Sequence, residues 1–265
     1  MSTIEWQPGQ GGAEDFIITN ATRDSSLSEA TRPVTGALWQ PEEHNPSTPL
    51  ILCGHGASGD RYQPPILHLA KRFLRERGYA TLSIDGPVHG LRQVGPGGRE
   101  ALQAEMQRSD FVDDMVSDWL IALASVTAER HLGTGPLGYF GLSMGTIFGL
   151  PLLAAAGKQG RSFRAAALGL AGTTGAVSFI SQRLLDDAST VTHPVAFLMQ
   201  LEDELFPRDG YLELFDALAT KDKRMHANPG LHPEIPAEEV AFCFDFLADR
   251  MEADIPRNIT NPIAD

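Results

Sequence analysis

The five residues Gly141-Leu142-Ser143-Met144-Gly145 constrain the fold of this chain more than any other stretch. They stand between a short apolar run, 136–140, and a helix-like run, 146–156. This context predicts a tight turn from a strand into a helix, the nucleophile elbow. Glycine at both flanking positions leaves room where a Cβ would strike neighbouring backbone. Ser143 would then stand at a strand end beside the positive end of a helix dipole.

The same pattern also occurs in ordinary glycine-rich turns between a strand and a helix, and this chain has 26 glycines. The motif alone therefore does not establish chemistry. Other groups at the correct places along the chain have to support it.

Apolar strand-like runs alternate with amphipathic helical runs from residue 50 onward. The predicted strands are 50–53, 79–84, 136–140, 165–170, 194–199 and a weak one at 224–227; helices are predicted from 64, from about 111, at 146–156, 178–185 and 210–219, and from 236. Strands that read as continuous apolar runs are typical of a mainly parallel sheet covered by helices on both faces. We therefore expect an α/β fold with about eight strands.

Two earlier extended segments, 15–20 and 32–40, are joined by the polar stretch from Ala21 to Ala30. They predict antiparallel strands at one edge of the sheet. We expect residues 1–265 to form a single domain, with 1–30 as an N-terminal edge strand and loop. The polar segment from Arg92 to Asp110 is too long for a plain strand-to-helix connection and predicts a small lid or rim helix.

Composition excludes several classes of function. The net charge of −13 and the absence of a Lys/Arg cluster disfavour a nucleic-acid partner. Cys53 and Cys243 sit in apolar runs, as small buried hydrophobes in a reducing compartment do, and no ligand spacing indicates a metal. We read no signal peptide and no apolar run of the ~20 residues that a membrane span needs. We expect a cytoplasmic protein without a membrane partner; its oligomeric state, a homodimer included, stays open.

Sites in open α/β sheets form beyond the carboxyl ends of the strands. The loop Gly54-His55-Gly56-Ala57 follows the first predicted parallel strand. The backbone N–H of Ala57 and that of Met144, directly after Ser143, could together stabilise a developing oxyanion. For the His55 side chain we expect a structural role in bracing this loop.

A serine hydroxyl needs a base, and the base needs an orienting acid. The acids Glu202, Asp203 and Glu204 follow the strand 194–199, and the residues alone leave the choice among them open. Of the eight histidines, His232 lies after these acids in a Gly/Pro loop before the last helix. His226 is the second choice, because it falls within the weak strand.

With these residues in this order, the sequence resembles the α/β-hydrolase superfamily from about residue 30 to 252. The resemblance rests on Gly54-His55-Gly56, the Ser143 turn, the acid and Gly230-Leu231-His232. It implies that Asp203, which precedes Leu205-Phe206-Pro207, is the acid.

The segment Asp85-Gly86-Pro87-Val88-His89-Gly90 is similar to a strand-end motif of the dienelactone hydrolase, acetyl xylan esterase and prolyl-oligopeptidase-like branches. Two features depart from the usual patterns: dienelactone hydrolases carry a cysteine nucleophile, and many members have glycine where this chain has Gln200. The short segment 172–193 implies a minimal cap and an open site.

The resemblance implies a serine hydrolase that cleaves a carboxylic ester of a small acyl substrate and needs no cofactor or metal. A thioesterase, an amidase or peptidase, and an acyltransferase would use the same residues. A non-catalytic ligand-binding module on a hydrolase fold is the alternative of a different class.

Overall fold

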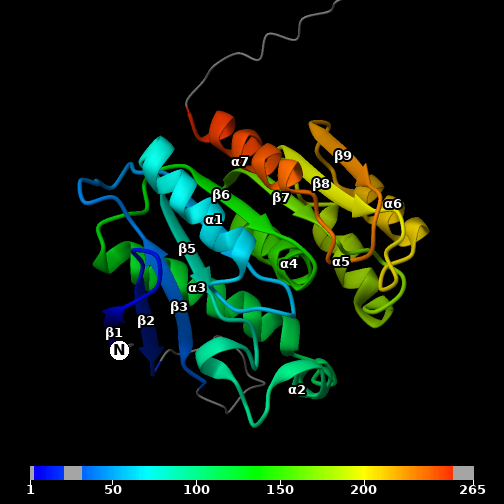
Figure 1. Ribbon diagram of the computed structural model, residues 1–265, viewed down its shortest axis with the longest axis horizontal. Coiled ribbons are helices and arrows are strands. Elements are labelled where there is room, and N and C mark those ends of the chain that lie inside the picture. The colour runs from blue at the N-terminus through cyan, green and yellow to red at the C-terminus, as the bar shows by residue number, and fades with distance from the viewer. Residues whose placement is uncertain (1–2, 21–31, 253–265) are drawn as a thin grey trace, which may run out of the picture.

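The computed structural model describes residues 3–20 and 32–252. Nine strands form one sheet in the order β1-β2-β3-β5-β4-β6-β7-β8-β9 (Figure 1). The strands are β1 (Thr3–Pro8), β2 (Glu14–Thr19), β3 (Val34–Trp39), β4 (Leu50–Gly54), β5 (Ala80–Ile84), β6 (Leu137–Gly141), β7 (Phe163–Gly169), β8 (Val195–Gln200) and β9 (Lys223–Asn228). The three pairings among β1, β2, β3 and β5 are antiparallel, and the remaining five are parallel. The expected mainly parallel sheet is confirmed.

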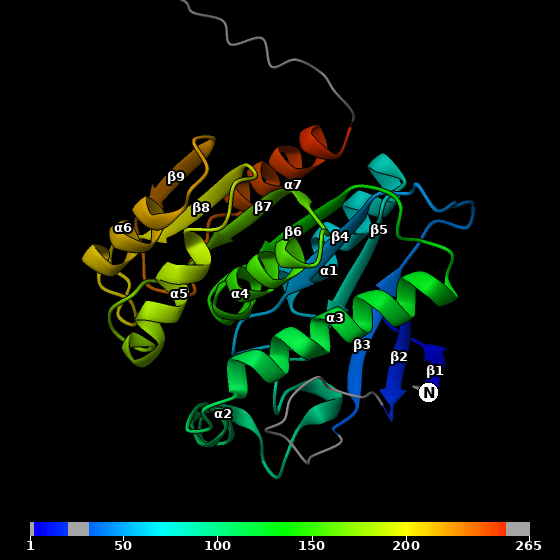
Figure 2. The ribbon, with the colours of Figure 1, turned by 180° about the vertical axis from the view of Figure 1, so that it is seen from behind.

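Helices cover both faces of this sheet. They are α1 (Pro64–Arg72), α2 (Gly98–Met106), α3 (Phe111–Glu129), α4 (Met144–Lys158), α5 (Ser181–Ala188), α6 (Arg208–Ala217) and α7 (Ala237–Met251). Helices α1 and α7 lie on one face (Figure 1), and α3, α4 and α5 lie on the other (Figure 2). Within the described residues, no helix has the length and apolar character required to cross a membrane.

The parallel strands are buried on both sides, which explains their continuous apolar runs. Along β4, Leu50 and Leu52 join the core under α3 and α4, whereas Ile51 and Cys53 join the core under α1 and α7. This alternation follows from the two-residue period of a strand. The carboxyl ends of the parallel strands therefore meet at one edge, which is where the loops with the predicted site residues begin.

Strand β1 was not expected from the sequence. Its Trp6 packs edge-on against Phe16 of β2, with ring centroids 5.6 Å apart, and donates a hydrogen bond of 2.7 Å to Glu129. The antiparallel edge thus contains three strands rather than two. The turn predicted at 21–30 lies outside the described residues. The predicted rim helix corresponds to α2.

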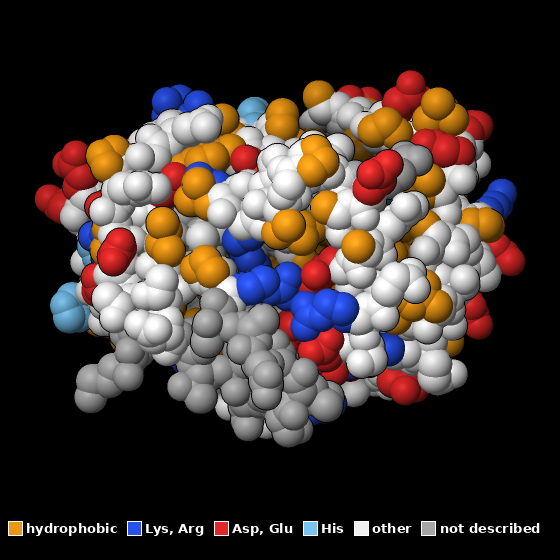
Figure 3. Space-filling model, turned by 90° about the horizontal axis from the view of Figure 1, so that it is seen from below, with side chains coloured by type: hydrophobic (Ala, Val, Ile, Leu, Met, Phe, Trp, Pro, Cys, Tyr) orange, Lys and Arg blue, Asp and Glu red, His pale blue; other side chains and the backbone are white. Residues whose placement is uncertain are grey.

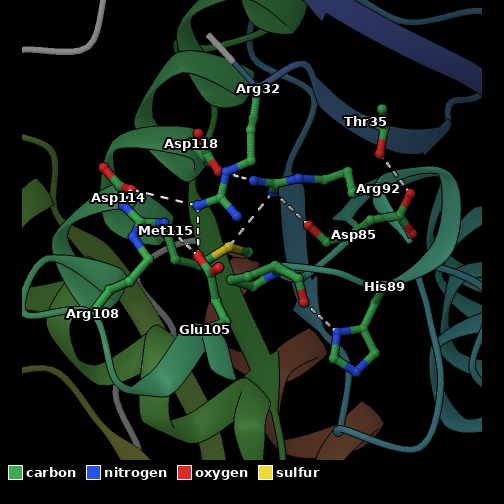
Figure 4. A network of polar contacts seen from close by, with 12 residues as sticks. Arg32, Thr35, Asp85, His89, Arg92, Glu105, Arg108, Asp114, Met115 and Asp118 are labelled. Atoms are coloured by element: carbon green, nitrogen blue, oxygen red, sulfur yellow. Dashed lines mark hydrogen bonds and ion pairs between the residues drawn. The ribbon is translucent and has the colours of Figure 1, made fainter. Parts of the chain in front are cut away.

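A buried ion cluster joins the antiparallel edge to the carboxyl end of β5. The Arg61 guanidinium donates to Asp15 of β2 at 2.8 Å and to Asp85, directly after β5, at 2.9 Å. All three side chains are at most 8% exposed. Thr35 of β3 donates to the same Asp85 carboxylate, as Figure 4 shows. Removal of the arginine would leave two buried carboxylates without a counter-ion, which is costly.

We predict that Arg61→Met destabilises the fold by about 3–5 kcal/mol, the usual cost of breaking a buried ion pair from one side. Urea denaturation followed by circular dichroism measures this loss. Glu76→Gln, which breaks the exposed pair with Arg72, is the control and should leave the midpoint unchanged. Equal midpoints for Arg61→Met and the wild-type protein would contradict the importance of the cluster.

Candidate active site

Ser143 occupies a strained turn between β6 and α4. Its backbone has φ +57°, a left-handed value that is uncommon for a residue with a side chain. A Cβ on Gly141 would lie 2.6 Å from the Gly145 carbonyl oxygen, and one on Gly145 would overlap the Gly54 carbonyl oxygen. Both glycines are thus required by close backbone contacts. The strand–turn–helix geometry expected from the five-residue pattern is present.

Hydrogen bonds fix this turn to the neighbouring strands. The Ser143 N–H donates to the Gly169 carbonyl at the end of β7, at 2.9 Å. The Thr146 hydroxyl accepts from the Gly169 N–H at 2.8 Å. The Tyr139 hydroxyl donates to the Gly145 carbonyl at 2.6 Å. The strained backbone at Ser143 is therefore held in place by its surroundings, as such strain requires.

Ser143, His232 and Asp203 form one hydrogen-bonded chain. His232 Nε2 lies 2.9 Å from Ser143 Oγ, and His232 Nδ1 lies 2.8 Å from Asp203 Oδ2. The arrangement suits a ring that donates from Nδ1 to the carboxylate and accepts the serine proton at Nε2. The structure thus brings together three residues that the sequence placed on three separate loops.

Asp203 is held as a carboxylate by several donors. Burial alone would raise its pKa. Hydrogen bonds from the Tyr211 hydroxyl, His232 and the N–H groups of Leu205 and Phe206 outweigh burial and hold the pKa of Asp203 below its ordinary value. Tyr211 of α6 was not singled out from the sequence, where it is one apolar-face residue among several. Its hydroxyl bonds the same carboxylate oxygen as His232.

The other two acids support the loop that carries His232. Glu204 accepts from the His232 backbone N–H at 2.9 Å, and Glu202 accepts from the Gly230 N–H at 2.5 Å. Gln200, which is 2% exposed, donates to the Glu234 carbonyl at 2.6 Å. These side chains bond backbone groups, whereas Asp203 bonds the imidazole ring.

His226, the second choice for the base, is engaged elsewhere. Its Nδ1 lies 2.8 Å from Glu239 of α7, and its ring stacks on Phe242 with centroids 4.1 Å apart. This pair ties β9 to α7. The geometry therefore favours His232 over His226.

The loop after β4 lies directly against the Ser143 turn. A Cβ on Gly56 would be 3.8 Å from the Leu142 carbonyl oxygen. Among the described residues, the N–H groups of Ala57 and Met144 donate to no protein acceptor, so both can donate to a substrate oxygen. Met144 is the first residue of α4, where the helix dipole favours negative charge.

His55 braces this loop from within. Its Nδ1 donates to the Gly56 carbonyl at 2.8 Å, and its Nε2 accepts from the Gly86 N–H at 2.7 Å. Burial is the main cause that lowers the pKa of His55 to about 4, so the ring is neutral near pH 7. A neutral ring is the form that these two bonds need. Across the described residues, no group of three or more His, Cys, Asp and Glu side chains could hold a metal ion.

Ion pairs anchor α2 beside α3. Arg108 pairs with Glu105 at 2.5 Å and with Asp110 at 2.9 Å, and Arg32 pairs with Glu105 at 2.6 Å. Figure 4 shows Arg32 and Arg108 on either side of Glu105 and Asp114. Figure 3 shows basic side chains with acidic ones beside them near the centre of the face seen from below. Charge pairing thus joins the predicted rim helix to the body of the protein.

The fold compares closely with that of a solved esterase. A PEG-bound cold-adapted esterase from an Arctic intertidal metagenomic library is 32% identical with a TM-score of 0.74, covering 93% of this chain and 99% of that one. The native structure of such an esterase gives 30% identity, a TM-score of 0.68 and coverages of 94% and 100%. The acetyl xylan esterase from Paenibacillus sp. R4 shares the fold at 16% identity, with a TM-score of 0.64 and coverages of 94% and 88%. Scans of family models and of curated proteins gave no match.

The chain therefore belongs to the esterase family of the α/β-hydrolase fold. The family resemblance carried by the sequence is confirmed.

We predict that Gly145→Ala lowers the thermal midpoint strongly, because the new Cβ would overlap the Gly54 carbonyl oxygen. Gly157→Ala, in the same helix α4, is the matched control. A Cβ at Gly157 meets nothing within 4 Å, so alanine should stabilise by about 0.5–1 kcal/mol. Similar midpoints for the two variants would show that the close backbone contact is not required.

We predict that Tyr211→Phe destabilises the protein in a pH-dependent way. The wild-type pKa of Asp203 is lowered, so its ionised form contributes stability above the unfolded pKa, and this contribution is lost as pH falls through the folded pKa. Removal of the Tyr211 hydroxyl raises that folded pKa and reduces the contribution. In thermal unfolding between pH 7 and 3, the difference from wild type should be largest near neutrality and shrink in acid. A difference that stays constant with pH would contradict this account.

Proposed function

We propose that this protein is a serine hydrolase that cleaves carboxylic esters of small acyl substrates through an acyl-enzyme intermediate. The observation that carries the proposal is the position of the His232 ring between Ser143 Oγ, at 2.9 Å, and Asp203 Oδ2, at 2.8 Å. Membership in an esterase family supports the same chemistry. We propose that the residues of this site all belong to a single domain and that α2 forms a rim or small lid beside the site.

In the first half of the reaction, Ser143 Oγ attacks the ester carbonyl carbon while His232 Nε2 takes the hydroxyl proton. Asp203 stabilises the resulting imidazolium through Nδ1–H. The carbonyl oxygen becomes an oxyanion, and the N–H groups of Ala57 and Met144 donate to it. The tetrahedral intermediate collapses, the C–O bond to the alcohol breaks, and His232 returns the proton to the leaving alkoxide.

In the second half, a water molecule replaces the alcohol. His232 takes a proton from this water as it attacks the acyl carbon, and the same two N–H groups stabilise the second oxyanion. Collapse breaks the bond to Ser143 Oγ, which recovers its proton from His232. The products are a carboxylic acid and an alcohol, and every proton is accounted for without a cofactor.

A fluorophosphonate probe and p-nitrophenyl acetate test the proposal together. The wild-type protein should be labelled covalently on Ser143, as peptide mass spectrometry will show, and should hydrolyse the ester. Ser143→Ala should lose the label and about 10⁴-fold or more in kcat. Ser189→Ala, which changes an exposed serine after α5, is the control and should keep both.

The same assay separates the two histidines that are paired with carboxylates. His232→Gln should lose about as much activity as Ser143→Ala, because the two act as one unit. His226→Gln breaks the bond to Glu239 and should cost stability but not turnover. A wild-type protein that is neither labelled nor active would instead favour a non-catalytic module. Matched ester, thioester and amide substrates then distinguish the enzyme classes that share these residues.

A further inference from the structure

His89 lies in the segment after β5 and contacts the loop after β4. The residue is 7% exposed, and its Nε2 lies 3.0 Å from the Ala57 carbonyl oxygen. Its Nδ1 lies 2.6 Å from the Pro87 carbonyl oxygen. Carbonyl oxygens only accept, so each ring nitrogen faces an acceptor, and a proton on Nε2 is donated to the Ala57 carbonyl.

The backbone of this segment is shaped to aim the ring. Val88 has φ +58°, which is strained for a β-branched residue. Gly90 has φ +53°, and a Cβ there would overlap the Asp85 carboxylate. That carboxylate is itself fixed by Arg61 and Thr35. The backbone that carries the His89 ring is therefore held in one conformation.

His89 and His55 connect the two loops in opposite directions. His55, from the loop after β4, accepts from the Gly86 N–H of the loop after β5 at 2.7 Å. His89, from the loop after β5, reaches the Ala57 carbonyl of the loop after β4. Their rings meet edge to face with centroids 5.2 Å apart. Movement of either loop would break bonds of both rings.

Ala57 is the residue that these contacts fix from both sides. Its N–H belongs to the peptide plane of the Gly56 carbonyl, which accepts from His55 Nδ1 at 2.8 Å. In a planar trans peptide the carbonyl and the N–H point in opposite directions, so the bond from His55 sets the direction of the Ala57 N–H. Rotation about the Ala57 backbone bonds remains possible until the Ala57 carbonyl is also held.

We propose that His89 is a positioning residue that holds the Ala57 carbonyl and so fixes the Ala57 N–H toward the substrate oxyanion. This inference rests on the function proposed above. Donors in an oxyanion hole are effective because they are oriented before charge develops, so a loosened donor lowers transition-state binding more than substrate binding. Loss of His89 should therefore lower kcat and leave KM nearly unchanged.

The test compares His89→Ala with His44→Ala. His44 also bridges two backbone carbonyls, those of Pro41 and Arg130, both at 3.0 Å, but it precedes β4 and so lies at the opposite edge of the parallel strands. With p-nitrophenyl acetate, His89→Ala should lose about 10- to 100-fold in kcat at nearly constant KM. The inhibition constant of phenylboronic acid, whose tetrahedral serine adduct mimics the oxyanion, should rise in parallel. His44→Ala should change the thermal midpoint but not kcat.

Several results would overturn the inference. These are a kcat of His89→Ala within twofold of wild type, a rise in KM alone, or a loss of kcat that His44→Ala matches at the same loss of thermal midpoint. Should His89→Ala fail to fold, His89→Gln keeps one N–H donor and should show a smaller kcat loss together with a correspondingly smaller rise in the boronate inhibition constant; an unchanged kcat and inhibition constant would count against the proposal. An inactive, unlabelled wild-type protein would refute the proposed function first, and the inference with it.

Discussion

The approach of the α4 backbone to the end of β4 is the constraint on which the site depends. Gly145 contacts Gly54 so closely that neither tolerates a side chain. A Cβ on Gly145 would overlap the Gly54 carbonyl oxygen, and a Cβ on Gly54 would overlap the Tyr139 hydroxyl. This contact seats the first turn of α4 over the carboxyl ends of β4 and β6. It presents Ser143 at the positive end of the α4 dipole and beside the loop that carries Ala57, where we propose that an oxyanion forms. A looser packing of α4 would separate these groups.

The loop that carries His232 shows a different use of charge. Asp203 bonds the ring, while Glu202 and Glu204 bond backbone N–H groups of the same loop. The carboxylates of Glu202 and Glu204 accept hydrogen bonds from backbone N–H groups and not from the imidazole ring. Three consecutive acids therefore divide into one that contacts the His232 ring and two that fix its loop. Gln200 completes this support through the Glu234 carbonyl, where glycine could offer no hydrogen bond.

The sequence predicted the parts of the fold that depend on local pattern. The buried parallel strands and the turn at Ser143 follow from apolar runs and glycine spacing. Strand β1 was missed although Ile4 and Trp6 alternate with exposed residues and a glycine-rich turn, 9–12, follows it, since six residues with two half-buried apolar positions give little pattern. Tyr211 lies only eight residues after Asp203, but in the sequence it is one apolar-face residue of α6 among several. The Arg61 cluster could not be predicted, because its partners lie on other elements and only the tertiary fold brings them together. For the same reason the sequence did not show His89 against Ala57.

Two histidines of this chain are paired with carboxylates in nearly the same way, and they are expected to differ completely in function. His226 meets Glu239 at 2.8 Å and His232 meets Asp203 at 2.8 Å. A carboxylate–histidine pair is therefore not itself a sign of catalysis, since here one such pair joins a strand to a helix. What distinguishes His232 is its second nitrogen, which faces a serine hydroxyl, whereas the His226 ring lies on Phe242. The chemistry proposed for His232 depends on a third partner beside the ring and its carboxylate. That partner is the Ser143 hydroxyl, which the strained turn supplies.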